Sequence, residues 1–247
     1  MSALRIERDG PLLRITIARP ERRNAFDAGL IAELAAAFSD VGDARVVLLA
    51  GDGPSFSAGA DVEWQRSAID LSYDENVEDA MRLYGMMEAI DACPAPVVAR
   101  IQGYALGGGS GLVACCDIAI AGTDAVFGFS EVKLGIIPAV ISPFVVPKIG
   151  VGAARRYFLT GERFDAETAL RIGLVHEVAD DLDEGIDRVV GELLTSGPEA
   201  VREAKRLLRD LPTGIDTAHV AARLRTSPEG QEGLRAFLER RDASWRS

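Results

Sequence analysis

The chain has 247 residues, 48% of them hydrophobic and 26% charged, a composition typical of a globular protein with a sizeable core. Its net charge of −11 argues against non-specific nucleic-acid binding, which needs a basic face, but permits an anionic small molecule held by a few local arginines. The three cysteines have neither a disulfide pattern nor a zinc spacing, and apolar runs are too short for a signal peptide or a membrane helix. We therefore expect a cytoplasmic protein without a metal, a nucleic-acid partner or a membrane span.

Apolar strands alternate with helices in the first half of the chain. The expected strands are runs of β-branched residues and leucine, namely Leu4–Arg8, Leu12–Ile17, Arg45–Ala50, Val97–Ile101 and Ile118–Ala121, with a turn at Asp9-Gly10 between the first two. Amphipathic helices are expected over Asp27–Phe38 and from about Glu75 to Ala92. This alternation indicates an α/β fold with parallel or mixed sheet and helical crossovers.

After about Pro143 the pattern becomes helical and strand-like runs nearly vanish. Helices are expected over Ala153–Leu159, Ala166–Arg171, Leu182–Leu194, Pro198–Leu211 and Pro228–Arg240. We predict an α/β core over residues 1–190 and a helical region over residues 191–247. Because no Ser/Gly-rich linker separates them, the helices are expected to pack on the core or on another subunit.

Two segments rich in small residues follow predicted strands. The first is S-F-S-A-G-A-D at residues 55–61, which either lets backbone approach a ligand or is a plain strand-to-helix turn capped by Asp61. The second, residues 102–112, contains three consecutive glycines at 107–109, each costing about 0.5–1 kcal/mol in a helix. Free amides at this helix start suit a developing negative charge, although tight helix–strand packing would also explain the glycines.

A dinucleotide-binding pattern, G-x-G-x-x-A, also fits residues 109–114 of the second segment. The acidic residue that should hold the ribose is poorly placed, however. Asp117 comes too soon after the glycines, and Glu131 lies beyond the next strand. The pattern is therefore a weak alternative.

A third segment, F-G-F-S-E-V-K-L-G at residues 127–135, places Glu131 among apolar residues and glycines. A carboxyl group in such surroundings tends to have a raised pKa, which suits general acid–base catalysis. The alternative is a capping or salt-bridged glutamate beside Lys133. His176 and His219 have no spacing typical of a metal site or a triad, and the cysteines are expected to be core thiols.

Taken in order, these segments resemble the crotonase superfamily, the enoyl-CoA hydratase/isomerase family. The similarity rests on A-G-A-D, then G-Y-A-L-G-G-G, then F-G-x-x-E-x-x-L-G, and extends to R-P-E-R-R-N-A at 19–25, L-T-G-E-R at 159–163 and F-L-E-R-R at 237–241. The resemblance implies a ClpP-like spiral of ββα units followed by a helical trimerisation region. It also implies a homotrimer or a homohexamer, and an acyl-CoA thioester as substrate with no separate cofactor.

The same resemblance assigns roles to particular residues. The backbone amides of Ala60 and Gly108 would polarise the thioester carbonyl, and Glu131 would be the acid or base. The residues expected to contact CoA or the acyl group are Arg22, Arg23, Ala58, Ala60, Asp61, Val62, Gly107, Gly108 and Gly111. An arginine pair would also suit phosphate binding on an acidic protein.

One departure from the family pattern affects the expected reaction. Two-glutamate hydratases carry a glutamate three positions after the residue equivalent to Gly108, where this chain has Gly111. We predict hydration of a 2-enoyl-CoA with Glu131 as acid or base. A Δ3,Δ2-enoyl-CoA isomerase that uses Glu131 alone, or a non-catalytic acyl-CoA- or RNA-binding member, are the alternatives.

A finer similarity concerns the run from Glu131 to Phe144 and the preceding C-C-D-I-A. These residues resemble bacterial methylglutaconyl-CoA-type hydratases, which also tend to lack the first glutamate. Trp64 and Phe129 are candidates for the lining of the substrate pocket, with a core role equally open for each.

Overall fold

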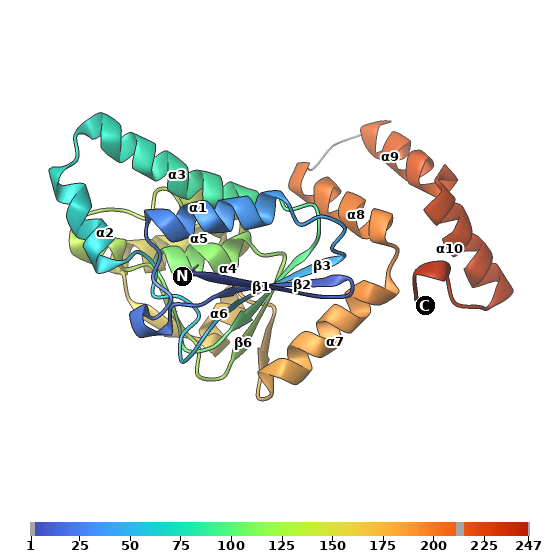
Figure 1. The fold of residues 1–247 in the computed structure, drawn as a ribbon, viewed down its shortest axis with the longest axis horizontal. Helices are drawn as coiled ribbons and strands as arrows, with labels where there is room; N and C mark the ends of the chain where they lie inside the picture. The colour runs from blue at the N-terminus through green and yellow to red at the C-terminus, as the bar shows by residue number, and fades with distance from the viewer. Residues whose placement is uncertain (1–2, 211–214, 247) are drawn as a thin grey trace.

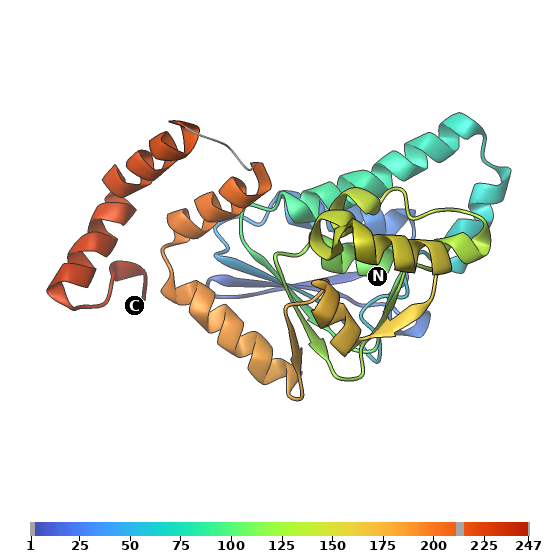
Figure 2. The same cartoon turned by 180° about the vertical axis from the view of Figure 1, so that it is seen from behind.

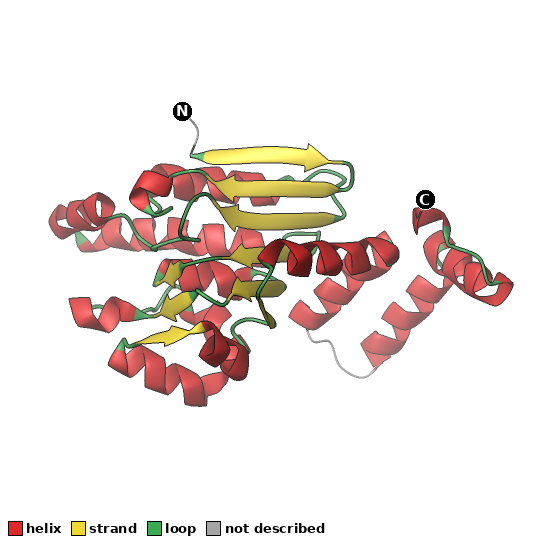
Figure 3. Ribbon diagram, turned by 90° about the horizontal axis from the view of Figure 1, so that it is seen from below, coloured by secondary structure: helices red, strands yellow, loops and turns green. Residues whose placement is uncertain are grey.

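The computed structural model describes residues 3–210 and 215–246 of the chain, and a six-stranded sheet lies at its centre (Figures 1 and 3). The order of the strands in this sheet is β1-β2-β3-β4-β6-β9. Only the β1–β2 pair is antiparallel, and the other neighbours run parallel. The strands are β1 (Leu4–Asp9), β2 (Leu12–Ile17), β3 (Val46–Gly51), β4 (Val97–Ile101), β6 (Ile118–Gly122) and β9 (Glu177–Ala179).

A second, three-stranded sheet lies beside the first. It consists of β5 (Tyr104–Leu106), β7 (Val126–Gly128) and β8 (Arg163–Asp165), in the order β5-β7-β8. Strand β4 of the large sheet leads into β5 of the small sheet and then into helix α4 (Gly108–Cys115). Strands β6 and β7 repeat this path and lead into α5 (Ser142–Thr160). These repeated units confirm the predicted spiral of ββα units.

Helices cover both faces of the large sheet, because its central strands are apolar on both sides. On β3, Val47 and Leu49 point into a core shared with α1 (Ala28–Ser39), α3 (Tyr73–Asp91), α4 and α5, on one side. The alternate residues Val46 and Leu48 point into a smaller core beneath α7 (Leu182–Thr195), on the other side. Figure 1 shows α1 and α3 on one side of the sheet and α7 on the other.

The C-terminal helices lie at one end of the molecule. They are α8 (Pro198–Asp210), α9 (Ile215–Thr226) and α10 (Pro228–Glu239), and Figure 2 shows α9 and α10 standing away from the α/β body. Arg45 ties this region to the sheet: its guanidinium donates to the carbonyls of Leu194 and Ser196, both at 2.8 Å, and of Trp245 at 2.9 Å. Large apolar side chains on α8 and α10 remain exposed in the single chain, among them Leu208, Phe237 and Leu238.

All five predicted strands are present within one residue at each end, and strands nearly vanish after Pro143 as expected, although the part after Pro143 is not wholly helical. Strands β8 and β9 lie there, and three-residue strands are too short to show a period in the sequence. The turn between β1 and β2 is at Gly10, since Asp9 still belongs to β1. The division at residue 190 falls inside α7 and stays a prediction.

The helices were predicted less completely. Helices α2 (Val62–Ser67) and α9 were not expected. Helix α5 begins well before Ala153, and its two halves are separated by a kink at Gly150, where φ is +72°. Helix α6 (Ala166–Ile172) agrees with its prediction, and Leu211, the predicted end of α8, lies outside the described residues. A search of the described helices found none long and apolar enough to cross a membrane.

The turn between the two sheets predicts a sharp effect of adding one methyl group. Gly103 has φ of +56°, and a Cβ there would lie 2.0 Å from the carbonyl oxygen of Pro54. Gly10 has nearly the same φ, +55°, with nothing within 4 Å of its Cβ position. We expect Gly103→Ala to lower the free energy of unfolding by about 1–3 kcal/mol more than Gly10→Ala in urea denaturation. Equal losses would contradict the close approach.

Candidate active site

The two predicted small-residue segments lie side by side. The amide of Phe56 donates to Gln102 O and that of Ser57 to Tyr104 O, both at 2.9 Å. The amide of Leu106 returns a bond to Ser57 O at 3.0 Å. The loop after β3 therefore continues the small sheet alongside β5, and this pairing brings residues 58–61 against the glycine cluster at 107–109.

Glycine is needed where these segments meet. Gly59 has φ of +85°, and a Cβ on it would lie 2.5 Å from Leu106 O and 3.3 Å from the amide nitrogen of Gly108. A Cβ on Gly108 would lie 2.3 Å from Cζ of Phe26. Close approach of backbone to backbone and to an aromatic ring is thus one reason for the glycines of this cluster.

Two backbone amides at this junction are left without a partner. Within residues 3–210 and 215–246, neither Ala60 N–H nor Gly108 N–H donates a hydrogen bond, whereas the amides of Gly59, Asp61 and Gly107 do. The Asp61 amide donates to Phe26 O at 2.9 Å, and the Gly107 amide donates to Gly128 O at 2.8 Å. Ala60 and Gly108 both line one cavity, so their free donors are available to an acceptor bound there.

This cavity has a volume of about 270 Å³ and mostly apolar walls. One wall comes from Phe26, Trp64 on α2 and Leu83 on α3. Further lining comes from η3 (Ser130–Leu134) and from the segment between η3 and α5. The polar side chains that line it are Gln65, Asp79, Ser130 and Glu131.

Glu131 lies in this cavity beside the glycine cluster. A Cβ on Gly107 would lie 3.3 Å from Glu131 Oε1, and Glu131 Oε2 is buried with no hydrogen-bond partner among the described residues. Burial raises the pKa of its carboxyl group, partly offset by a hydrogen bond to its own backbone amide. The alternative of a glutamate paired with Lys133 is wrong, since no ion pair joins these two side chains in the described part of the chain and Glu131 Oε2 has no partner.

Comparison with known proteins agrees with this arrangement. The sequence profile of a family described as Enoyl-CoA hydratase/isomerase matches residues 7–247. The chain belongs to this family. The family resemblance and the crotonase fold expected from the sequence are thereby confirmed.

Individual members of the family show how far the similarity extends. A crystal structure of an enoyl-CoA hydratase from Shewanella pealeana has 40% identical residues and a TM-score of 0.93, over 98% of this chain and 96% of the other. The chain is 31% identical to the crotonyl-CoA hydratase of Syntrophomonas wolfei, covering 97% of this chain and 96% of that protein. It is 32% identical to the cyclohexa-1,5-dienecarbonyl-CoA hydratase of Thauera aromatica, covering 97% and 95%.

The position where two-glutamate members of the family carry their first glutamate is blocked here. Gly111 is buried in α4 and does not line the cavity. A Cβ on it would lie 2.5 Å from Ile141 Cγ2 and 3.1 Å from Met87 Cε. Ile141 itself lines the cavity, so an apolar side chain stands in front of this position.

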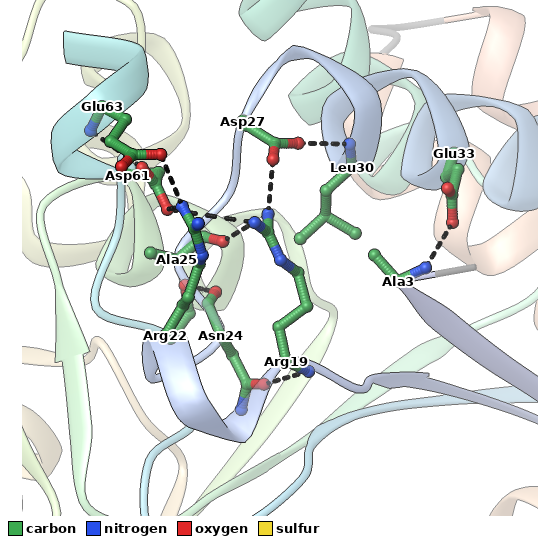
Figure 4. Close-up of polar contacts among 11 residues, drawn as sticks. Ala3, Arg19, Arg22, Asn24, Ala25, Asp27, Leu30, Glu33, Asp61 and Glu63 are labelled. Atoms are coloured by element: carbon green, nitrogen blue, oxygen red, sulfur yellow. Dashed lines mark hydrogen bonds and ion pairs between the residues drawn. The ribbon is translucent and has the colours of Figure 1, made fainter. Parts of the chain in front are cut away.

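The residues expected to contact CoA separate into two groups. Ala58 and Gly107 line the cavity together with Ala60 and Gly108. The other group lies outside its lining: Arg22 and Arg23 at the end of η1 (Pro20–Arg22), and Asp61 and Val62 at the start of α2. Figure 4 shows Arg22 beside Asp61. The assignment of these residues to CoA binding stays a prediction.

Arg22 is paired in the absence of ligand. Its guanidinium donates to Asp61 at 2.9 Å and to Glu63 at 3.2 Å (Figure 4), and this lowers the pKa of Asp61. Asp61 also accepts the Glu63 amide at 2.8 Å, so it caps α2 as one reading of the sequence expected. Arg23 is exposed, with its guanidinium 6.0 Å from the centre of the Tyr104 ring.

Sequence reasoning did not assign a role to Asn24, which organises the loop next to the free amides. Asn24 is fully buried at a φ of +55°. Its side chain accepts from the Arg19 amide at 2.9 Å and donates to Asp52 O at 2.8 Å and Ser55 O at 2.7 Å. The asparagine of the R-P-x-x-x-N-A pattern was the available signal. Sequence reasoning also missed Asp79, which stands in a largely polar stretch of α3.

Trp64 and Phe129, the two aromatic candidates for the pocket lining, differ in their placement. Trp64 lines the cavity, whereas Phe129 is fully buried against Phe158 and Phe164 in the core. The pocket role of Phe129 is therefore corrected to a core role.

The remaining candidates take no part in the site. All three cysteines are buried, and burial raises the pKa of each thiol. Asp117, which the dinucleotide pattern would need, accepts the Val97 amide and pairs with Lys205, both at 2.7 Å. His176 accepts the Ala119 amide through Nδ1. No group of three potential metal ligands occurs among residues 3–210 and 215–246.

The close packing of Gly111 against Ile141 predicts that substitutions at these two positions are coupled. We expect Gly111→Ala to lower the free energy of unfolding by about 1–3 kcal/mol, since its Cβ would overpack against Ile141. The loss in the double variant with Ile141→Ala should be smaller than the sum of the two single losses, because the shorter side chain makes room. Urea denaturation of the four proteins measures this. The control is Gly152→Ala, at an exposed helical glycine with free space around its Cβ position, and it should not lower the free energy of unfolding. Additive losses for the substitutions at 111 and 141 would refute the packing.

Proposed function

We propose that the protein is an enoyl-CoA hydratase, which adds water across the C2–C3 double bond of a 2-enoyl-CoA. The observation that supports this best is the combination of two unpaired amides with a carboxylate that has one buried, unpaired oxygen, all lining one apolar cavity. The family includes hydratases that differ in acyl group, as the names of the two relatives indicate.

In the proposed mechanism, the amides of Ala60 and Gly108 donate to the oxygen of the thioester carbonyl. This withdraws electrons from the conjugated double bond and makes C3 electrophilic. When water adds at C3, negative charge develops on the thioester oxygen, which these two donors would bind. Preorganised donors of this kind are typically worth about 3–4 kcal/mol of transition-state stabilisation each.

Glu131 would transfer the proton at C2. A carboxyl group with an ordinary pKa is almost fully ionised at neutral pH, but burial raises the pKa of Glu131 and increases the protonated fraction. The same group can then give a proton to the enolate in hydration and remove it in the reverse reaction.

The CoA moiety is proposed to lie over the turn at Arg22 and Arg23, near the start of α2. Asp61 and Glu63 already pair with Arg22, so a phosphate would compete with them for this guanidinium. Arg23 is exposed and is the freer of the two for phosphate binding. We further propose a homotrimer or homohexamer, since α10 exposes Phe237 (81%) and Leu238 (78%) in the single chain.

A Δ3,Δ2-enoyl-CoA isomerase is the second candidate. Ile141 stands where the first glutamate of two-glutamate hydratases would project, and isomerisation needs only one group to move a proton between C2 and C4. Incubation with a panel of 2- and 3-enoyl-CoAs in ¹⁸O-labelled water separates the two, because hydration alone gives a labelled 3-hydroxyacyl product. The panel includes 3-methylglutaconyl-CoA, since the Glu131–Phe144 run resembles hydratases of that type.

We expect Glu131→Gln to lower kcat for the best substrate of this panel by at least about a hundredfold, which is the usual contribution of a positioned acid–base group. Steady-state kinetics with the wild type and this variant measures the loss. Glu78→Gln, which removes an exposed carboxylate from α3, should keep normal turnover. Full activity in Glu131→Gln would disprove its role.

The raised pKa of Glu131 also predicts a pH-dependent difference in stability. Because folding raises this pKa, the ionised side chain opposes folding, and the wild type loses stability as pH rises from the unfolded pKa through the folded one. Glu131→Gln has no such loss. Its Tm should equal or exceed that of the wild type at pH 8, and the gap should close as pH falls toward 4. A Tm at pH 8 below that of the wild type would contradict the assignment.

A further inference from the structure

A second carboxylate lines the same cavity as Glu131. Asp79 on α3 and Glu131 on η3 are the acidic residues of this lining among the described part of the chain. The two come from different elements of the fold, and Leu83, one turn after Asp79 on α3, also lines the cavity. The cavity therefore holds two carboxylates although Gly111 provides none.

Asp79 lies on the side of α3 that faces the protein. Four apolar residues of α3 that pack into the main core follow Asp79 at spacings of four, three, one and three, namely Leu83, Met86, Met87 and Ile90. Asp79 extends this row of inward-facing residues by one turn toward the N-terminus of α3. Its side chain is only 15% exposed. A carboxylate at an apolar position of an amphipathic helix is costly unless something there uses it.

The partner of Asp79 within the protein is weak. Arg82 Nη2 lies 3.3 Å from Asp79 Oδ1, one turn along the same helix, and the Arg82 side chain is 57% exposed. Ion pairs at i,i+3 on a helix contribute about 0.2–0.5 kcal/mol, so this pair does not explain why a carboxylate lines the cavity. Asp79 keeps acceptor capacity for a bound molecule, because a carboxylate has about four acceptor sites.

We infer that Asp79 is the second catalytic carboxylate of the proposed hydration and activates the water that the missing glutamate at position 111 cannot. This inference rests on the proposed function. Asp79 accepts a proton from water as the water oxygen forms its bond to C3. The π electron pair of C2=C3 moves into the thioester enolate held by the Ala60 and Gly108 amides, and Glu131 then gives its proton to C2. The proton on Asp79 returns to Glu131 through solvent, so the net change is addition of one water.

The two carboxylates have separable roles, and this permits a sharp experiment. Exchange of a C2 hydrogen of butyryl-CoA with D2O needs the oxyanion amides and Glu131, but no water addition at C3. We expect Asp79→Asn to lower kcat for hydration about a hundredfold or more and to retain C2 exchange within threefold of the wild type. Glu131→Gln should lose both reactions. Mass spectrometry follows exchange, and absorbance of the conjugated thioester follows hydration.

Three further variants test whether Asp79 acts only through structure. Arg82→Gln removes its ion-pair partner and Glu78→Gln removes a neighbouring charge from α3, and both should hydrate within threefold of the wild type. Asp79→Glu keeps the carboxylate and should recover part of the lost kcat.

The outcomes distinguish the inference from the proposed function. If the wild type hydrates and exchanges while Asp79→Asn hydrates normally, Asp79 is not the water-activating group and only the inference fails. Loss of hydration in Arg82→Gln equal to that in Asp79→Asn would also overturn it in favour of a structural ion pair. A wild type that hydrates none of the enoyl-CoAs would instead overturn the proposed function.

Discussion

The site depends on one constraint: two stretches of backbone must run in direct contact where the large sheet passes into the small one. Residues 56–57 pair with the chain at 102–106, and Gly59 then passes close to Leu106 O and the Gly108 amide. This contact aligns the Ala60 and Gly108 amides on the same cavity and leaves both unpaired. Backbone donors held in this way need no reorganisation when charge develops on a bound carbonyl oxygen. The buried Asn24 and the sharp turn at Gly103 serve the same contact from outside the cavity.

Several parts of this arrangement are visible in the sequence because they require particular residue types. Positions with positive φ or close backbone approach exclude most side chains, so the glycines at 59, 103 and 107–109 mark the places where the chain is forced together. The β3 run is apolar at every position because helices cover both of its faces, and its length and composition indicate a buried strand. Glu131 stands out for the opposite reason, as a charged residue among apolar ones.

Other parts could not be predicted, since they depend on distant packing rather than on local pattern. Strands of three residues, such as β5 and β9, have too few positions to show a period, and they form because neighbouring strands offer partners. Asp79 lies in a stretch of α3 with acidic residues on several sides, so only the fold distinguishes it from Glu78 or Asp74. Phe129 and Trp64 were equivalent as candidates. They separate into core and cavity because Phe129, just before η3, packs among core aromatic rings, whereas Trp64 on α2 lines the cavity.

The packing of Gly111 against Ile141 also bears on how such a site changes over generations. A glutamate restored at position 111 would meet the Ile141 side chain, so that single step is unfavourable even though it would recreate the common two-glutamate arrangement. Ile141 must shrink first, and that step alone leaves a void in the cavity wall. The residue tolerated at either position therefore depends on the residue at the other, and a return to two glutamates requires both to change.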